Sequence, residues 1–126
     1  MSRALVIDDD EELVKLIGIL LKRIGIESVV ASNGQAALDI LAAEPMDVVI
    51  LDLMLPDMNG FEILRRVRGL TQYDSTPILI LSAKADAVSI REGLDLGADG
   101  YITKPYVGSN LTERIQSLIS NGRRKP

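Results

Sequence analysis

The stretch Asp47–Gly60, DVVILDLMLPDMNG, decides the fold of this chain. Its residues Val48–Leu51 form an unbroken aliphatic run, which predicts a strand buried on both faces, as in a parallel sheet covered by helices. The run ends at Asp52, and Pro56 and Asn59-Gly60 then predict a loop. A carboxylate directly after such a strand either caps a turn or lies at the sheet edge where open α/β sheets bind ligands.

Composition limits the chemistry that the chain can perform. Its 126 residues suffice for one domain with a core, and 47% apolar and 25% charged residues are typical of a globular protein. It contains no cysteine and no histidine, which excludes disulfides, thiol catalysis, a histidine base and imidazole metal ligands. The net charge of −4 argues against nucleic-acid binding through a broad basic surface. Because no apolar run could span a bilayer and no signal-peptide pattern is present, a cytoplasmic protein without membrane contact is expected.

Strand and helix patterns alternate five times along the chain. Strands are expected at residues 4–7, 27–31, 48–51, 77–81 and 101–103, and helices at about 13–24, 36–45, 61–68, 85–96 and 109–120. This alternation with short connections predicts an α/β fold with a five-stranded parallel sheet and five helices on its two faces. The expected arrangement is doubly wound and flavodoxin-like, with strand order 2-1-3-4-5.

Some side chains indicate where helices end and which way they face. Asp10 is the expected N-cap of the first helix, and Gly97 is expected to end the fourth. Three arginines of the third helix are expected to face solvent: Arg65, Arg66 and Arg68. Residues 1–121 are predicted to form the domain. Residues 122–126, with Arg123, Arg124 and Lys125, are predicted to be a solvated basic tail or the start of a linker.

Polar side chains follow four of the five expected strands. Asp8 and Asp9 follow the first, Asp52 the third, Ser82 ends the fourth, and Lys104 follows the fifth. Because the order 2-1-3-4-5 puts strands one and three beside the switch point, these side chains are expected to meet at one edge of the sheet. Three close carboxylates suit Mg²⁺, and a carboxylate beside Mg²⁺ can attack phosphorus to form an aspartyl phosphate.

The motifs LVIDDDEEL, LDLMLPDMNG, ILILSAK and GADGYITKPY occur in that order, and through them the chain resembles the receiver domain of two-component response regulators. The resemblance covers nearly the whole chain. It implies that Asp52 accepts a phosphoryl group from a phosphohistidine of a histidine kinase or a histidine phosphotransfer protein. It also implies that Mg²⁺, or another divalent cation such as Mn²⁺, binds to Asp9, Asp52 and the backbone carbonyl of Met54, with Asp8 holding a metal-bound water.

The resemblance further assigns roles to residues around the phosphoacceptor. Ser82 and Lys104 would contact phosphoryl oxygens, and the Lys104–Pro105 peptide would be cis. Ser82 and Tyr101 would form a switch that changes the surface made by the fourth helix, fifth strand and last helix. The domain would promote only its own phosphorylation and dephosphorylation, and would act on an output domain or effector that its sequence does not identify.

A phosphorylation-dependent homodimer through that surface stays open. Gly100 and Asn110 stand where family members of the winged-helix transcription-factor type often carry acidic residues.

Three other functions are open to a chain with this pattern. A phosphatase of the haloacid dehalogenase type would also use Mg²⁺ and an aspartate nucleophile, but it requires a second aspartate where Met54 stands. A flavodoxin-like cofactor binder would need a loop rich in glycine, serine and threonine after the first strand, where this chain has three aspartates. A receiver could also work unphosphorylated, as a docking surface.

Overall fold

A computed structural model describes residues 2–124 of the chain. The strands are β1 (Ser2–Ile7), β2 (Ile26–Ala31), β3 (Val48–Leu51), β4 (Ile78–Ser82) and β5 (Gly100–Thr103). The helices are α1 (Glu11–Arg23), α2 (Gly34–Ala43), α3 (Gly60–Arg68), α4 (Ala87–Asp95) and α5 (Gly108–Asn121), with a 3₁₀ turn, η1 (Thr71–Tyr73). None of the helices in this described range combines the length and apolar character needed to cross a bilayer.

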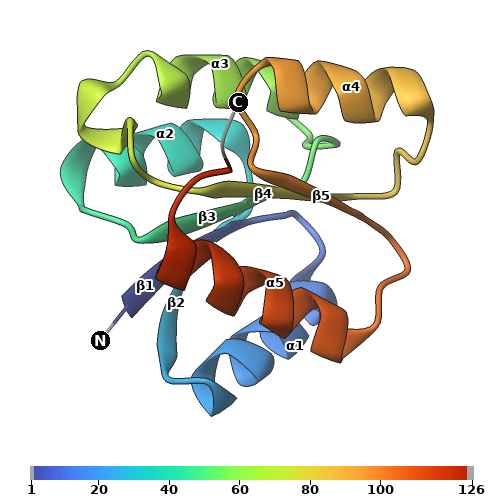
Figure 1. Ribbon diagram of the computed structural model, residues 1–126. Helices are drawn as coiled ribbons and strands as arrows, with labels where there is room; N and C mark the ends of the chain where they lie inside the picture. Colours follow the sequence, from blue (N-terminus) through green and yellow to red (C-terminus); the bar gives the residue numbers. More distant parts are fainter. Residues whose placement is uncertain (1, 125–126) are drawn as a thin grey trace.

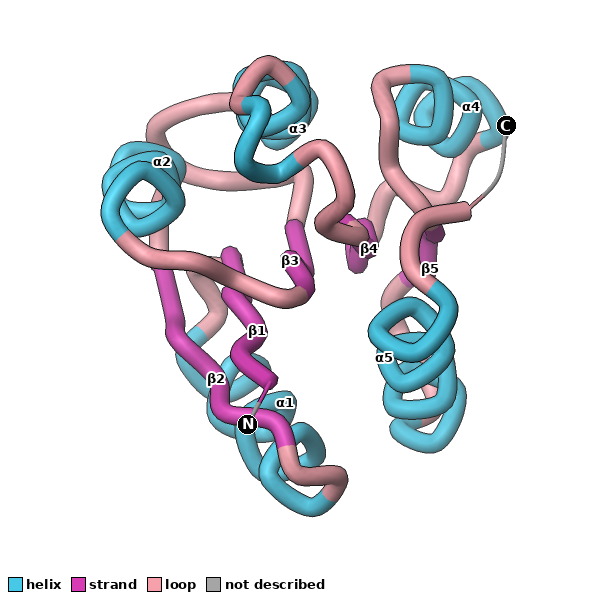
Figure 2. The backbone as a smooth tube through the Cα atoms, turned by 60° about the vertical axis from the view of Figure 1, so that its left-hand side comes forward, coloured by secondary structure: helices cyan, strands magenta, loops and turns pink. Residues whose placement is uncertain are grey.

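All five strands pair in parallel, in the order β2-β1-β3-β4-β5. This confirms the expected fold class and strand order. Helices α1 and α5 cover one face of the sheet, and α2, α3 and α4 cover the other (Figures 1 and 2). The order reverses at β1, so the chain leaves β1 and β3 toward opposite faces and opens a crevice at their carboxyl ends.

Alternate residues of the central strands build two separate cores, one on each face. In β3, Val49 and Leu51 pack with α2 and α3, while Val48 and Ile50 pack with α1 and α5. The same alternation holds in β1 and β4. It explains why the buried central residues of these strands are apolar on both sides of the sheet, since neither face meets water there.

Two helix ends are set by the side chains that the sequence singles out. Asp10 caps α1 by accepting hydrogen bonds from the backbone N–H groups of Glu12 and Leu13. Gly97, just beyond α4, has φ of 110°, which favours glycine. The expected start of the fourth helix at residue 85 is two residues early, because Asp86 caps α4 through the N–H of Ser89.

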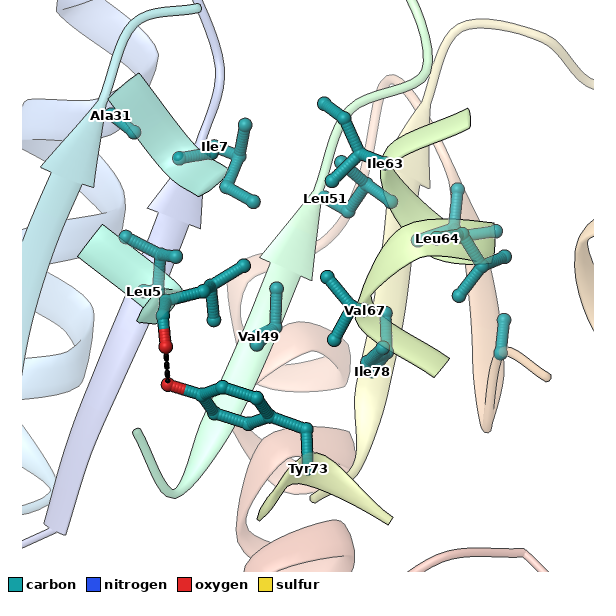
Figure 3. Close-up of a cluster of buried hydrophobic side chains, with 14 of the residues drawn as sticks. Leu5, Ile7, Ala31, Val49, Leu51, Ile63, Leu64, Val67, Tyr73 and Ile78 are labelled. Carbon is teal, nitrogen blue, oxygen red and sulfur yellow. Dashed lines mark hydrogen bonds between the residues drawn. The ribbon is translucent and has the colours of Figure 1, made fainter. Parts of the chain in front are cut away.

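Tyr73 anchors a turn that sequence periodicity does not predict. It lies in η1 with 2% of its surface exposed, below Val49 in Figure 3. Its hydroxyl donates to the carbonyl oxygens of Leu41 at 2.8 Å and Glu44 at 2.5 Å. The turn therefore closes one end of the core against the last turn of α2.

Arg68 is not on the solvent face of α3, and that expectation is wrong. Its side chain is 12% exposed and its Nη2 lies 2.8 Å from Oδ2 of the fully buried Asp99. It also donates to the carbonyl oxygens of Gly97 at 3.0 Å and Tyr73 at 2.9 Å. Burial and the neighbouring charge of Arg123 lower the pKa of Arg68 to about 10, so it stays charged at neutral pH.

The described part of the basic tail, residues 122–124, contacts the domain instead of extending into solvent. Nε of Arg123 lies 2.9 Å from Oδ1 of Asp99, and the backbone N–H of Arg124 donates to the same oxygen at 3.1 Å. The guanidinium of Arg124 donates to the carbonyl oxygens of Ala98 and Leu94. Arg123 and Arg124 therefore contact the domain, although Arg124 is still exposed to solvent, and Lys125 lies outside the described residues.

Candidate functional site

Hydrogen bonds that continue the sheet beyond its strands fix the backbone of the candidate site. The N–H of Asp8 donates to Ala31 at 3.1 Å, and the N–H of Asp52 donates to Ile7 at 2.9 Å. At the other side of the crevice, the N–H of Lys104 donates to the carbonyl of Ser82 at 2.9 Å. The expected strand-end residues therefore lie together at the carboxyl edge, held by the sheet itself.

Lys104 joins two buried carboxylates. Its Nζ lies 2.8 Å from Oδ2 of Asp8 and 3.3 Å from Oδ2 of Asp52. The carboxylates are 4% and 7% exposed and the lysine side chain is 21% exposed. Burial lowers the pKa of Lys104, but the hydrogen bond to Asp8 and the charge of Asp52 outweigh it, so the net pKa is raised. Lys104 is thus a stable cation in this site.

The pairing with Lys104 does not fully compensate the cost of burying the negative charge of Asp8. Burial raises its pKa, although Lys104 and the N–H of Asp10, which donates to Oδ1 at 3.0 Å, act in the opposite direction. Lys104 is shared between two carboxylates. Both carboxylates stabilise the charge of Lys104, whereas each of them receives only part of the stabilisation that one lysine can give. Asp8, Asp9 and Asp52 each offer a carboxylate oxygen, and these oxygens lie within 4.8 Å of one another. This all-oxygen set with excess negative charge fits a hard divalent cation such as Mg²⁺.

The carboxylate of Asp52 is held at both oxygens. Oδ2 faces Lys104, and Oδ1 accepts a hydrogen bond from the backbone N–H of Met54 at 3.2 Å. Met54 itself forms an isolated antiparallel bridge with Asn59 across the loop, and its side chain is exposed. The orientation of Asp52 therefore depends on the loop that follows it.

Ser82 and Tyr101 meet at the loop between β4 and α4. Ser82 is fully buried, and its Oγ accepts from the backbone N–H of Lys84 at 3.3 Å. The hydroxyl of the half-buried Tyr101 donates to the carbonyl of Lys84 at 2.6 Å. The ring of Tyr101 packs beside Gly93 of α4, where a Cβ would lie 2.6 Å from Cδ1 of Ile80 and in ordinary contact with the ring. Both expected switch residues thus contact one short loop.

Two further features complete the surroundings of the site. The Lys104–Pro105 peptide bond is cis, as expected. Asp57, to which the sequence pattern assigns only a place in the loop, accepts hydrogen bonds from the backbone at the start of α2. An aspartate after a proline is typical of a turn, so no local signal could have identified its distant partner.

Comparison with known proteins agrees with this geometry. The family model described as "Response regulator receiver domain" matches residues 4–116. Response regulator ArlR of Staphylococcus haemolyticus is 40% identical over 126 residues, which are 100% of this chain and 55% of that protein. The chain therefore spans about half the length of the curated relatives it matches.

Solved structures with the same fold include two receiver proteins. The Francisella response regulator 1452 receiver domain has a TM-score of 0.88 and 33% identity, over 96% of this chain and 98% of that one. Chemotaxis response regulator CheY4 of Vibrio cholerae has a TM-score of 0.88 and 32% identity, over 94% of this chain and 98% of that one.

Proposed function

Because this chain belongs to the response regulator receiver domain family and is a receiver domain of two-component signalling, we propose that Asp52 is its phosphoacceptor. The observation that carries the proposal is the contact of Lys104 with both Asp8 and Asp52 at the carboxyl edge of the sheet. A nucleophilic carboxylate, a charged lysine and an acidic set that suits a divalent cation are together sufficient for phosphoryl transfer.

Each side chain of the site has a defined task in this transfer. Asp8, Asp9, Asp52 and the carbonyl of Met54 would hold Mg²⁺, which supplies charge neutralisation when bound. One oxygen of Asp52 attacks the phosphorus of a phosphohistidine on the donor protein. The phosphorus–nitrogen bond breaks, and its electron pair returns to the imidazole. Lys104 pairs with one phosphoryl oxygen, and the hydroxyl of Ser82 donates to another.

The new charge on Asp52 would change the surface of α4, β5 and α5. Ser82 must turn its hydroxyl toward the phosphoryl group, which disturbs the loop whose Lys84 backbone it contacts. The carbonyl of Lys84 accepts the hydrogen bond from Tyr101, so the two movements would be coupled through the backbone of one residue. A dianionic group thereby biases a two-state element. Sedimentation before and after phosphorylation tests whether this surface forms a homodimer.

The partners follow from this role. A histidine kinase or a histidine phosphotransfer protein in the cytoplasm would supply the phosphoryl group, and an output domain or effector would bind the switched surface. The domain would act on its own aspartyl phosphate and on no external substrate, and would bind neither nucleic acid nor membrane directly. Family membership favours this role over a phosphatase or a flavin binder.

Intact mass after incubation with a small acyl phosphate and Mg²⁺ tests the proposal. We expect the wild type to gain one phosphoryl group, and Asp52→Asn or a chelator to prevent the gain. Asp74→Asn, which changes an exposed aspartate in the same way, should be labelled like the wild type. Undiminished labelling of Asp52→Asn would contradict the assignment. If neither the acyl phosphate nor phosphohistidine donors label the wild type, the phosphoacceptor role is rejected. The domain then works as an unphosphorylated docking surface.

A further inference from the structure

Asp57 connects two segments that are distant in the sequence. Its Oδ1 accepts from the backbone N–H of Gly34 at 2.7 Å, and its Oδ2 accepts from the N–H of Gln35 at 3.0 Å. These two residues begin α2, whereas Asp57 lies in the loop between β3 and α3. Helix α2 already has a local cap, because Asn33 accepts from Ala36. The two hydrogen bonds to Asp57 therefore do not replace the local cap. They connect the loop to the helix across the fold.

Close packing supports this connection. A Cβ on Gly34 would lie 2.3 Å from Cγ of Met58, so the loop and the helix approach too closely for any other residue at position 34 without movement of Met58. The pKa of Asp57 is lowered, first by the hydrogen bond from Gly34 and then by that from Gln35, so the carboxylate is charged at neutral pH. Charged acceptors make the stronger hydrogen bonds.

The other end of the loop is fixed next to the acidic site. The N–H of Gly60 donates to the carbonyl of Leu53 at 2.9 Å, and a Cβ on Gly60 would lie 2.5 Å from Cα of Leu53. Between these two residues the loop is held at its base by the Met54–Asn59 bridge and at its tip by Asp57. Met54, whose N–H contacts Asp52, is three residues from that tip.

We propose that Asp57 is a positioning residue for the cation and for phosphoryl transfer: it holds the loop that carries Met54. This inference rests on the proposed function, because it assumes that the carbonyl of Met54 is a metal ligand. Without the two bonds to α2, the loop tip is released, and only the bridge to Asn59 still holds the Met54 backbone, whose carbonyl would bind the cation and whose N–H contacts Oδ1 of Asp52. Groups that orient metal ligands commonly change metal affinity by tenfold or more when they are removed.

Two substitutions of Asp57 make the test graded. Asp57→Ala removes both acceptors, and Asp57→Asn keeps one, because an amide has a single acceptor oxygen. We expect the Mg²⁺ dissociation constant, measured by calorimetry without any phosphodonor, to rise about tenfold in Asp57→Ala and by less in Asp57→Asn. Asp39→Asn is the matched control, because it removes the same charge from the exposed side of α2 and leaves the loop contacts in place.

Labelling kinetics provide the second readout. The Mg²⁺ concentration that gives half the maximal labelling rate should rise by the same factor as the dissociation constant. The maximal rate at saturating Mg²⁺ should stay within about twofold of the wild type, because Asp57 touches no reacting atom. If Asp57 served only as a cap of α2, its replacement would lower the urea midpoint of unfolding. It would then change neither the Mg²⁺ dissociation constant nor the Mg²⁺ concentration that gives half the maximal labelling rate.

The outcomes separate this inference from the proposed function. Wild-type Mg²⁺ affinity in Asp57→Ala, or an equal loss in Asp39→Asn, would overturn the positioning role while leaving Asp52 as the phosphoacceptor. If the wild type itself binds no Mg²⁺, the proposed function fails and the inference fails with it.

Discussion

Replacing Asp99 with asparagine should remove a large part of the stability of this domain. Four donors contact the buried carboxylate at 2.8 to 3.1 Å: Nη2 of Arg68 and the N–H of Ile78 on one oxygen, Nε of Arg123 and the N–H of Arg124 on the other. An amide has one acceptor oxygen, so two of these donors would face an NH₂ group.

The size of the loss follows from this arrangement. Breaking a buried ion pair by removing one partner costs about 3–5 kcal/mol. The lower end applies, because the Arg123 side chain is 32% exposed and can turn to water. We therefore expect Asp99→Asn to lower the free energy of unfolding by about 3 kcal/mol, from a total that is on the order of 5–15 kcal/mol for such domains. The corresponding fall in Tm is about 10 °C.

Urea unfolding followed by far-ultraviolet circular dichroism measures this change. Asp74→Asn is the control, because its exposed carboxylate accepts no hydrogen bond within residues 2–124, and it should stay within about 0.5 kcal/mol of the wild type. Labelling of Asp52 should persist in folded Asp99→Asn, since Asp99 precedes β5 and Lys104 follows it. A loss below about 0.5 kcal/mol in Asp99→Asn would refute the reasoning, because the carboxylate would then hold no net favourable interaction.

Three other substitutions test how buried polar groups contribute to the stability of the domain. Asp8→Asn should raise the urea midpoint of the metal-free protein at pH 7 and weaken Mg²⁺ binding. Burial raises the pKa of Asp8, so the charged carboxylate is less favourable in the folded state than in the unfolded chain. A lower urea midpoint in Asp8→Asn than in the wild type would contradict this reasoning. Tyr73→Phe should cost about 1–2 kcal/mol, because the buried carbonyl of Leu41 and the partly buried carbonyl of Glu44 lose the one hydroxyl that they share. Tyr106→Phe should cost nothing, since its buried hydroxyl has no partner in the described residues, and equal losses in the two variants would refute the distinction.

Most of the fold can be predicted from local patterns. The apolar run Val48–Leu51 predicts a strand buried on both faces, and the structure confirms this with β3 between two cores. Five such alternations leave few topologies, because parallel strands need crossover helices of one hand. The meeting of Asp8, Asp52 and Lys104 also follows from the sequence, because each directly follows a strand and parallel strands end at one edge.

Tertiary structure alone decided the contacts that have no local pattern. Arg68 has the spacing of a solvent-facing residue, yet it pairs with Asp99, 31 positions away. Asp57 is a loop residue by every local signal, yet it binds the start of α2, 23 positions away. Periodicity reports only which side of an element is apolar. Which buried or distant partner a charged side chain meets depends on how the packed helices face one another, and that is fixed only when the chain is folded.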